Sequence, residues 1–223
     1  MKQIYTIILF LSILAVSTTL VAQEKTFMQS ITLEAGGGYN LPVSPSRNNS
    51  TMSDYAGFSS FYLGANYAIS ELAGLRFSYG NNSFEDTNNS SLGVTLHKFM
   101  AEGTFNILQA IEKQQTPFEI MAHAGAGFSF GKNEQSSQTD RMISAQIGLM
   151  PRYRITNNFS VLLDAAYVIN LKQNFYFDGG TMPEGGDKGG FFMVNLGVAY
   201  SFWETRDQGL ETRDKRQETR NQG

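Results

Sequence analysis

Large apolar residues alternate with small or polar residues near the carboxyl end of the chain, between Phe191 and Trp203. One set holds the large side chains Phe192, Val194, Leu196, Val198, Tyr200 and Phe202, and the other ends in Asn195, Gly197, Ala199 and Ser201. Successive side chains of a β-strand point to opposite faces, so one face of this segment is fully apolar. About eleven residues of tilted strand cross a hydrocarbon layer of about 30 Å. The segment is therefore predicted to be a membrane-spanning strand.

The same period of two predicts eight strands along the chain. They lie at residues 31–39, 57–69, 75–79, 99–107, 118–130, 144–155, 160–169 and 191–203. Pro151 predicts a bulge in the sixth strand, because proline cannot donate a hydrogen bond to a neighbouring strand. The alternation changes phase near Leu96, which predicts that the residues before Phe99 belong to a loop.

The connections between these strands alternate in length. Long polar connections are predicted at 40–55, 80–91, 131–139 and 172–189, and short ones at 70–72, 109–116 and 156–158. Transmembrane barrels have this alternation, since their short turns face the periplasm and their long loops face outside. The predicted fold is all-β, an eight-stranded antiparallel up-and-down transmembrane barrel over residues 31–203. Closing the sheet removes its unpaired edges, which lipid requires.

The two ends of the chain differ in composition from the strands. Residues 1–22 have a lysine, an apolar run and a final small residue, which predicts a secretory signal peptide followed by a linker at 23–30. Residues 204–223 repeat a seven-residue unit three times imperfectly, with almost no large apolar residue. We expect a disordered, low-complexity tail there. The chain has no cysteine, so neither a disulfide framework nor a lipidated cysteine is available.

The second face of the predicted strands carries the charged residues that would point into the barrel. They are Glu34, Arg76, Glu102, Glu119, His123, Arg152, Arg154 and Asp164. An eight-stranded barrel is just wide enough to be filled by side chains, and an unpaired buried charge is costly. Arg152 is therefore expected to pair with Asp164 across the tight turn, and Arg76 with Glu102.

Overall composition agrees with this class of protein. Aromatic and glycine residues are abundant (17 Phe, 10 Tyr and 22 Gly), charged residues make up 17%, and the formal net charge is −3. Such a small charge gives no reason to expect a nucleic-acid partner.

The chain resembles the outer-membrane β-barrel family typified by the transmembrane domain of outer-membrane protein A, in a Bacteroidetes-like version. The resemblance rests on the alternating segments 118–130 and 153–167 and on the terminal segment 195–202. It implies the outer membrane of a Gram-negative bacterium as location and outer-membrane lipids as partners. It also implies that Tyr200, Phe202 and Trp203 form the signal read by the barrel assembly machinery.

The leading functional prediction is a non-enzymatic barrel with an envelope-structural role or a surface-interaction role through its loops. One alternative is a lipid-A-modifying barrel enzyme that uses His123, Ser129 and Glu119, although the period places all three inside. The other is a soluble, lipocalin-like barrel whose apolar face would enclose a ligand. No cofactor or metal site is expected. His97 is predicted at the rim, Asp178 and Asp187 in a solvated loop, and Gly36–Gly38 lacks the pattern of a phosphate-binding loop.

Overall fold

A computed structural model describes residues 30–44, 52–86, 89, 92–112, 116–133, 138–183 and 186–202. Its elements follow one another as β1 Ile31–Ser44, η3 Met52–Tyr55, β2 Gly57–Ala68, β3 Ala73–Glu85, β4 Gly93–Asn106, α2 Ile107–Glu112, β5 Phe118–Asn133, β6 Thr139–Arg154, β7 Phe159–Gln173 and β8 Asp187–Ser201. The predicted signal peptide, the tail at 204–223 and Trp203 lie outside the described residues. No helix in the described ranges has the length and apolarity that a membrane crossing requires.

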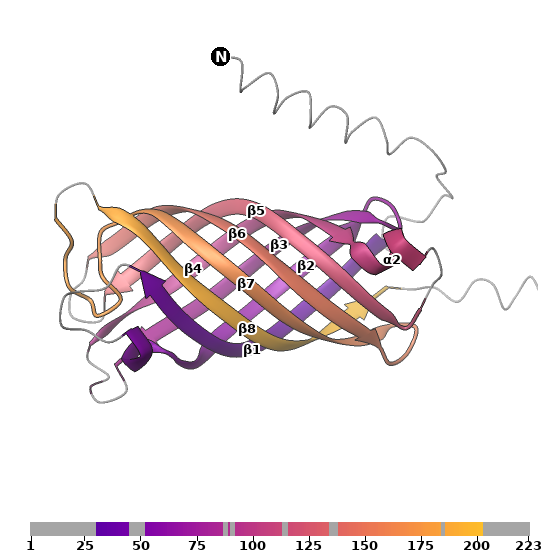
Figure 1. The fold of residues 1–223 in the computed structure, drawn as a ribbon, viewed down its shortest axis with the longest axis horizontal. Helices are drawn as coiled ribbons and strands as arrows, with labels where there is room; N and C mark the ends of the chain where they lie inside the picture. Colours follow the sequence, from indigo (N-terminus) through magenta and orange to yellow (C-terminus); the bar gives the residue numbers. More distant parts are fainter. Residues whose placement is uncertain are drawn as a thin grey trace, which may run out of the picture.

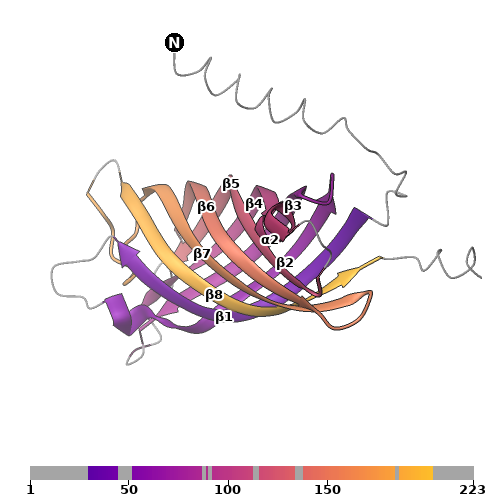
Figure 2. The same ribbon diagram turned by 45° about the vertical axis from the view of Figure 1, so that its right-hand side comes forward.

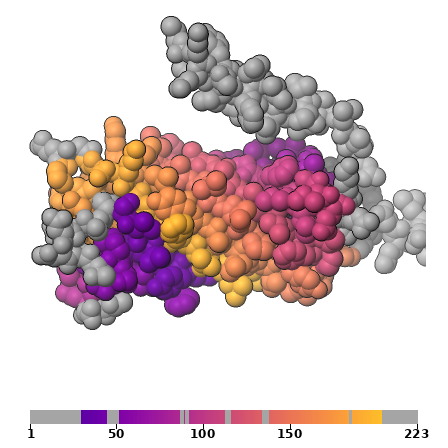
Figure 3. Space-filling model, in the orientation of Figure 1, coloured from indigo at the N-terminus to yellow at the C-terminus, as the bar shows by residue number. Residues whose placement is uncertain are grey.

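The strands form one closed antiparallel barrel in chain order (Figure 1). The first and last strands close it, with a register that runs from Thr32 opposite Ser201 to Ser44 opposite Gly190. The predicted eight-stranded up-and-down barrel is therefore confirmed. The space-filling view shows a continuous wall over the face of the barrel that is in view (Figure 3).

The barrel has two different ends. At the turn end lie the connections 69–72, 107–117 and 155–158, together with the start of β1 and the end of β8 (Figure 2). At the loop end lie the connections 45–56, 86–92, 134–138 and 174–186. We call the first the turn end and the second the loop end.

The two faces of the barrel wall carry different side chains. Large apolar residues are exposed on the outer face of all eight strands; examples are Leu33, Leu63, Phe77, Phe99, Phe128, Ile147, Leu163 and Leu196. Polar residues such as Arg76, Asp164 and Asn195 are buried on the inner face. The barrel is thus apolar outside and partly polar inside, the reverse of a soluble protein.

Three predictions about local structure are wrong. β4 continues without a break through Leu96, which points inward with Val94 and Lys98. The alternation of residue types is interrupted there only because the interior changes from polar to apolar. Pro151 makes no bulge: β6 and β7 keep one register on both sides of it, from Leu149 opposite Ala165 to Arg152 opposite Leu162.

The third wrong prediction concerns the connections at the turn end. The connection 107–117 contains α2 and is longer than 86–92 or 134–138 at the loop end, so the lengths do not alternate strictly. The side-chain oxygen of Asn106 accepts a hydrogen bond from the Gln109 amide at 3.1 Å. This is the capping contact that starts a helix, and it explains why the chain coils here instead of turning at once.

Candidate functional site in the barrel interior

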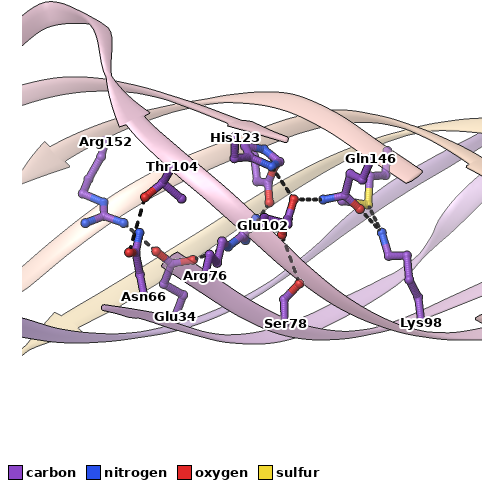
Figure 4. A network of polar contacts seen from close by, with 12 residues as sticks. Glu34, Asn66, Arg76, Ser78, Lys98, Glu102, Thr104, His123, Gln146 and Arg152 are labelled. Atoms are coloured by element: carbon purple, nitrogen blue, oxygen red, sulfur yellow. Dashed lines mark hydrogen bonds and ion pairs between the residues drawn. The ribbon is translucent and has the colours of Figure 1, made fainter. Parts of the chain in front are cut away.

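The middle of the barrel holds a layer of ion pairs centred on Arg76 of β3 (Figure 4). Its guanidinium group contacts three carboxylates from different strands. Nε lies 2.9 Å from Glu34 of β1, Nη2 lies 2.8 Å from Asp164 of β7, and Nη1 lies 3.3 Å from Glu102 of β4. Arg76 is 1% exposed. A buried guanidinium group needs such partners, since an uncompensated charge in an apolar wall is strongly unfavourable.

His123 of β5 extends this layer with both of its ring nitrogens. Nδ1 lies 2.7 Å from Glu102, and Nε2 lies 3.1 Å from Asp164. The amide of Gln146 donates to Glu102 at 3.0 Å, and its oxygen accepts a hydrogen bond from the Lys98 ammonium group. We call the residues Glu34, Arg76, Lys98, Glu102, His123, Gln146, Arg152 and Asp164 the ionic layer.

The structure places the four predicted lumen residues in this layer, with partners that differ in part from those expected. Arg76 and Glu102 are brought together. Arg152 pairs instead with Glu34 at 2.6 Å, so the expected pair with Asp164 is not present. Arg152 lies opposite Leu162, one inward-facing position nearer the turn end than Asp164. From that height its side chain reaches across the lumen to β1, while Arg76 and His123 occupy Asp164.

The loop end of the interior is closed by an apolar plug. The plug consists of Tyr55, Phe84, Val94, Leu96, Met142, Ala166, Val168, Phe175, Phe177, Phe191 and Met193. The rings of Phe84 and Phe177 lie 4.6 Å apart between centroids, and those of Phe84 and Phe191 lie 5.0 Å apart. Burial, helped by the nearby carboxylates of Asp86 and Asp178, raises the pKa of Tyr55 to about 12.

Hydrogen bonds hold the connection between β7 and β8 in this plug. The Asp140 carboxylate accepts from the backbone and side-chain nitrogens of Asn174 at 2.6 and 2.7 Å, and Asn133 donates to the Gly179 carbonyl at 2.6 Å. Gln173 donates to the Phe175 carbonyl at 2.7 Å. These contacts aim Phe175 and Phe177 into the barrel mouth.

A cavity of about 420 Å³ occupies the turn end of the interior. Polar residues dominate its lining, among them Thr32, Asn66, Thr104, Asn106, Arg152 and Ser160. A second space of about 10 Å³ lies beside Arg76, Lys98 and Gln146, and has room for about one water molecule. The ionic layer and the plug stand between the turn-end cavity and the loop end, so the cavity does not run through the barrel.

The residues considered for catalysis are separated from one another. Ser129 lies 2.6 Å from Ser144 in a hydrogen bond between hydroxyl groups, and Glu119 accepts from Arg154 at 2.6 Å near the rim. His123 is saturated by its two carboxylates, as described above. His97 is on the outer face, where Nδ1 lies 2.8 Å from the Tyr79 hydroxyl group. Among the described residues, no hydrogen bond joins His123, Ser129 and Glu119 to one another, because each is engaged by a different partner.

The residues considered for metal or phosphate binding have structural partners. Asp178 accepts a hydrogen bond from the Gly180 amide at 2.8 Å, and Asp187 accepts one from the Lys188 amide at 2.7 Å. Gly36–Gly38 lies within β1. Among the described residues, no three His, Cys, Asp or Glu side chains are grouped as a metal site.

Of the three assembly-signal residues, two are described. Tyr200 is at the end of β8, and its ring packs against Phe202 and Phe159 with centroid distances of 5.1 and 5.0 Å. Lys98 was missed by the sequence prediction, because the strand was expected to begin at Phe99. Counting back by two from Glu102 through Met100 would have placed Lys98 on the inner face.

Comparison with known proteins supports the fold. No protein-family model matches this chain, and no curated protein is significantly similar to it. Neisserial surface protein A has a similar structure, with a TM-score of 0.53 and 15% identity over 78% of this chain and 97% of that one. For the N-terminal β-barrel domain of Pseudomonas aeruginosa OprF the TM-score is 0.46 and the identity is 18%, over 78% of this chain and 98% of that one. For a major outer membrane protein from Thermus thermophilus the TM-score is 0.47 and the identity is 13%, over 77% of this chain and 98% of that one. The likeness to the neisserial protein, at this low identity, concerns the fold.

Proposed function

We propose that this chain is a non-enzymatic integral protein of the outer membrane, which supports the envelope or contacts other surfaces through its loops. The observation that carries the proposal is the belt of large apolar side chains around the whole outer face. Monomeric soluble proteins rarely expose a continuous apolar patch of more than a few hundred Å². A belt on all eight strands of a closed barrel suits lipid as its surroundings.

The interior favours this proposal over a lipocalin-like carrier. Such a carrier keeps an apolar cavity for its ligand, whereas the turn-end cavity here is lined mainly by polar residues and ends at the ionic layer. The plug fills the apolar part of the lumen with the protein's own side chains. An apolar ligand therefore has no matching space in the described interior.

The partners of the candidate catalytic residues favour a non-enzymatic role. His123 and Ser129 point into the barrel, away from the lipid that a lipid-modifying enzyme acts on, and both are engaged by other buried side chains. By the usual length rule, the loop end would face outside and the turn end the periplasm. The connection 174–186 and its neighbours then form the surface available to partners. The assembly machinery would read Tyr200, Phe202 and Trp203 at the periplasmic end.

Gel mobility and protease accessibility test the proposal. The membrane fraction of expressing cells should contain a compact band that changes mobility on boiling, and protease added to intact cells should cleave at the loop end only. Extraction without detergent would support the soluble carrier instead. Mass spectrometry of lipid A tests the enzyme alternative. A lipid A modification that is present with the wild type and lost with His123→Ala and Ser129→Ala would support a lipid-A-modifying enzyme.

A further inference from the structure

The lysine and arginine residues of the described chain are unevenly placed. Arg76, Lys98 and Arg152 are buried in the ionic layer, and Arg154 pairs with Glu119 near the turn end. The others are Lys132, Arg141, Lys172 and Lys188, and all four are exposed at the loop end of β5, β6, β7 and β8. In the described part of β1–β4, no lysine or arginine is exposed at that end. Among the described residues, exposed positive charge at this end is therefore confined to β5–β8.

The strand register brings these four residues into one row. Lys132 lies opposite Thr139, two positions from Arg141 on the next strand. Ile143 lies opposite Leu171, which puts Lys172 near the level of Arg141. Gln173 lies opposite Asp187, so Lys172 and Lys188 are also neighbours. With strands about 4.8 Å apart, the row is about 14 Å wide. We call it the basic row.

A bulge in β7 adds Lys172 to the row. The register with β8 shifts between Asn170 and Gln173, and Lys172 has a φ of 59°. Strict alternation would turn Lys172 inward after the exposed Leu171, but the bulge leaves both side chains exposed. A lysine in this left-handed conformation costs about 1 kcal/mol. The chain thus departs from regular geometry at the place where a fourth cation becomes accessible.

The described carboxylates near the basic row have hydrogen-bond partners other than the four cations. Asp140 is buried and holds Asn174, while Asp187 on β8 accepts a hydrogen bond from the Lys188 amide. Glu85 lies on the opposite side of the rim, where it accepts a hydrogen bond from Ser83. Among the described residues, none of the four cations forms an ion pair with a carboxylate.

An apolar wall lies directly below the basic row on the same strands. Its exposed side chains are Phe128, Phe130, Ile143, Ile169, Leu171 and Phe192. Long basic side chains at the border of such a wall extend toward the headgroups of a bilayer. Lysine and arginine bind phosphate through charge-assisted hydrogen bonds. Acyl chains would lie against the wall while phosphates reach the row.

We propose that the basic row binds a diphosphorylated lipid of the lipid A type in the leaflet at the loop end. The proposal rests on the proposed function, because it needs the outer face to be in lipid. A row of four cations about 14 Å wide is too broad for one phosphate and suits a headgroup that carries two. The site lies on the side of the barrel formed by β5–β8, where the strand register places all four cations.

Binding of diphosphoryl lipid A to the folded protein in neutral detergent micelles tests the proposal. The variant K132Q/R141Q/K172Q/K188Q should raise the dissociation constant at least about tenfold, because each cation near a headgroup contributes separately. The matched variant K132R/K172R/K188R keeps the charges and should bind like the wild type. Arg154→Gln, which removes a cation from the turn end, should also leave binding unchanged. Compact gel mobility verifies that each variant is folded.

Three further probes identify the ligand. Monophosphoryl lipid A should bind more weakly than the diphosphorylated form, and inorganic phosphate should compete only at far higher concentration. Equal binding by the wild type and the glutamine variant would overturn the proposal, as would heparin binding more tightly than lipid A through the same four residues. If either result is obtained with a protein that still inserts into vesicles, the proposed lipid site is wrong while the proposed function stands. Failure to insert would remove the proposed function itself.

Discussion

Arg76 is the residue on which the interior depends most. It is the one side chain of the ionic layer that contacts all three carboxylates, from β1, β4 and β7. Two of these carboxylates also bind His123. A single guanidinium group thus compensates charge contributed by strands on opposite sides of the barrel. Arg152 contacts only Glu34 of the three carboxylates, and His123 contacts only the other two.

Arg76→Met should therefore destabilise the barrel by about 3–5 kcal/mol, since it leaves buried carboxylates without their shared partner. The free energy of unfolding can be measured in lipid vesicles by urea titration of the compact gel band. Arg154→Met is the matched control: its ion pair with Glu119 is half-exposed, and such pairs contribute less than about 1 kcal/mol. Similar losses in the two variants would contradict this role for Arg76.

Strand β8 shows how one element serves two environments. Its outer face carries Phe192, Val194, Leu196 and Val198, all exposed, and its inner face carries the buried Met193 and Asn195. Along β8, apolar side chains that suit lipid thus alternate with side chains that fit the lumen. Leu196 lies near the middle of the strand and is 69% exposed.

Leu196→Arg should cost about 2–4 kcal/mol in a bilayer, because it places a charge near the middle of the hydrocarbon layer. The same urea titration measures the loss. Val43→Arg provides the comparison on an outer face near the loop end, where the expected cost is about 0–1 kcal/mol. If both substitutions were neutral, the outer face would be in water and the belt would need another explanation.

How far the sequence predicts the elements depends on what surrounds them. Alternation identifies strands and faces correctly where lipid lies outside and polar groups inside, as for Glu34, Glu102 and Asp164. It fails at the loop end, where β1 reaches Ser44 and β3 reaches Glu85. On β3 the outer face is polar there, as at Asn81 and Ser83, while the inward-facing Phe84 belongs to the plug. On β1 the outer face stays apolar, at Leu41 and Val43. Polar residues that look like a loop are in fact strand.

Ion-pair partners could be predicted only between neighbouring strands. Arg76 and Glu102 lie opposite one another on β3 and β4, so a period of two and a guess at the register bring them together. Arg152 and Glu34 meet across the lumen, from β6 and β1. That contact depends on strand tilt and side-chain reach, and neither is visible in the spacing of residues along the chain.

The whole molecule is a closed wall with a blocked interior. The turn-end cavity leads to the ionic layer, and the ionic layer is followed by the plug. A hydrated ion would have to displace either paired charges or packed aromatic rings. The narrow lumen of an eight-stranded barrel leaves no path around them.

In planar bilayers the protein should therefore show no stable open-channel conductance. Phe177→Ala removes part of the plug but leaves the ionic layer intact, so this variant should also stay closed. Single-channel recording at high salt, with a general porin as positive control, makes the comparison. Steady openings of the wild type would contradict a blocked interior, and openings of the variant alone would assign the seal to the plug.

The ionic layer also determines when the barrel can finish folding. Glu34 meets Arg152 across 118 positions of sequence, and Arg76 meets Asp164 across 88. Contacts between such distant residues form late, because the entropy cost of closing a long loop comes before the contact can stabilise the fold. In a sheet of five or six strands Arg76 could meet Glu102 on the neighbouring strand, but Asp164 of β7 would be missing and Arg152 would not yet reach Glu34 across a closed lumen. We therefore expect the last contacts of the ionic layer to form together with the closure of β1 against β8.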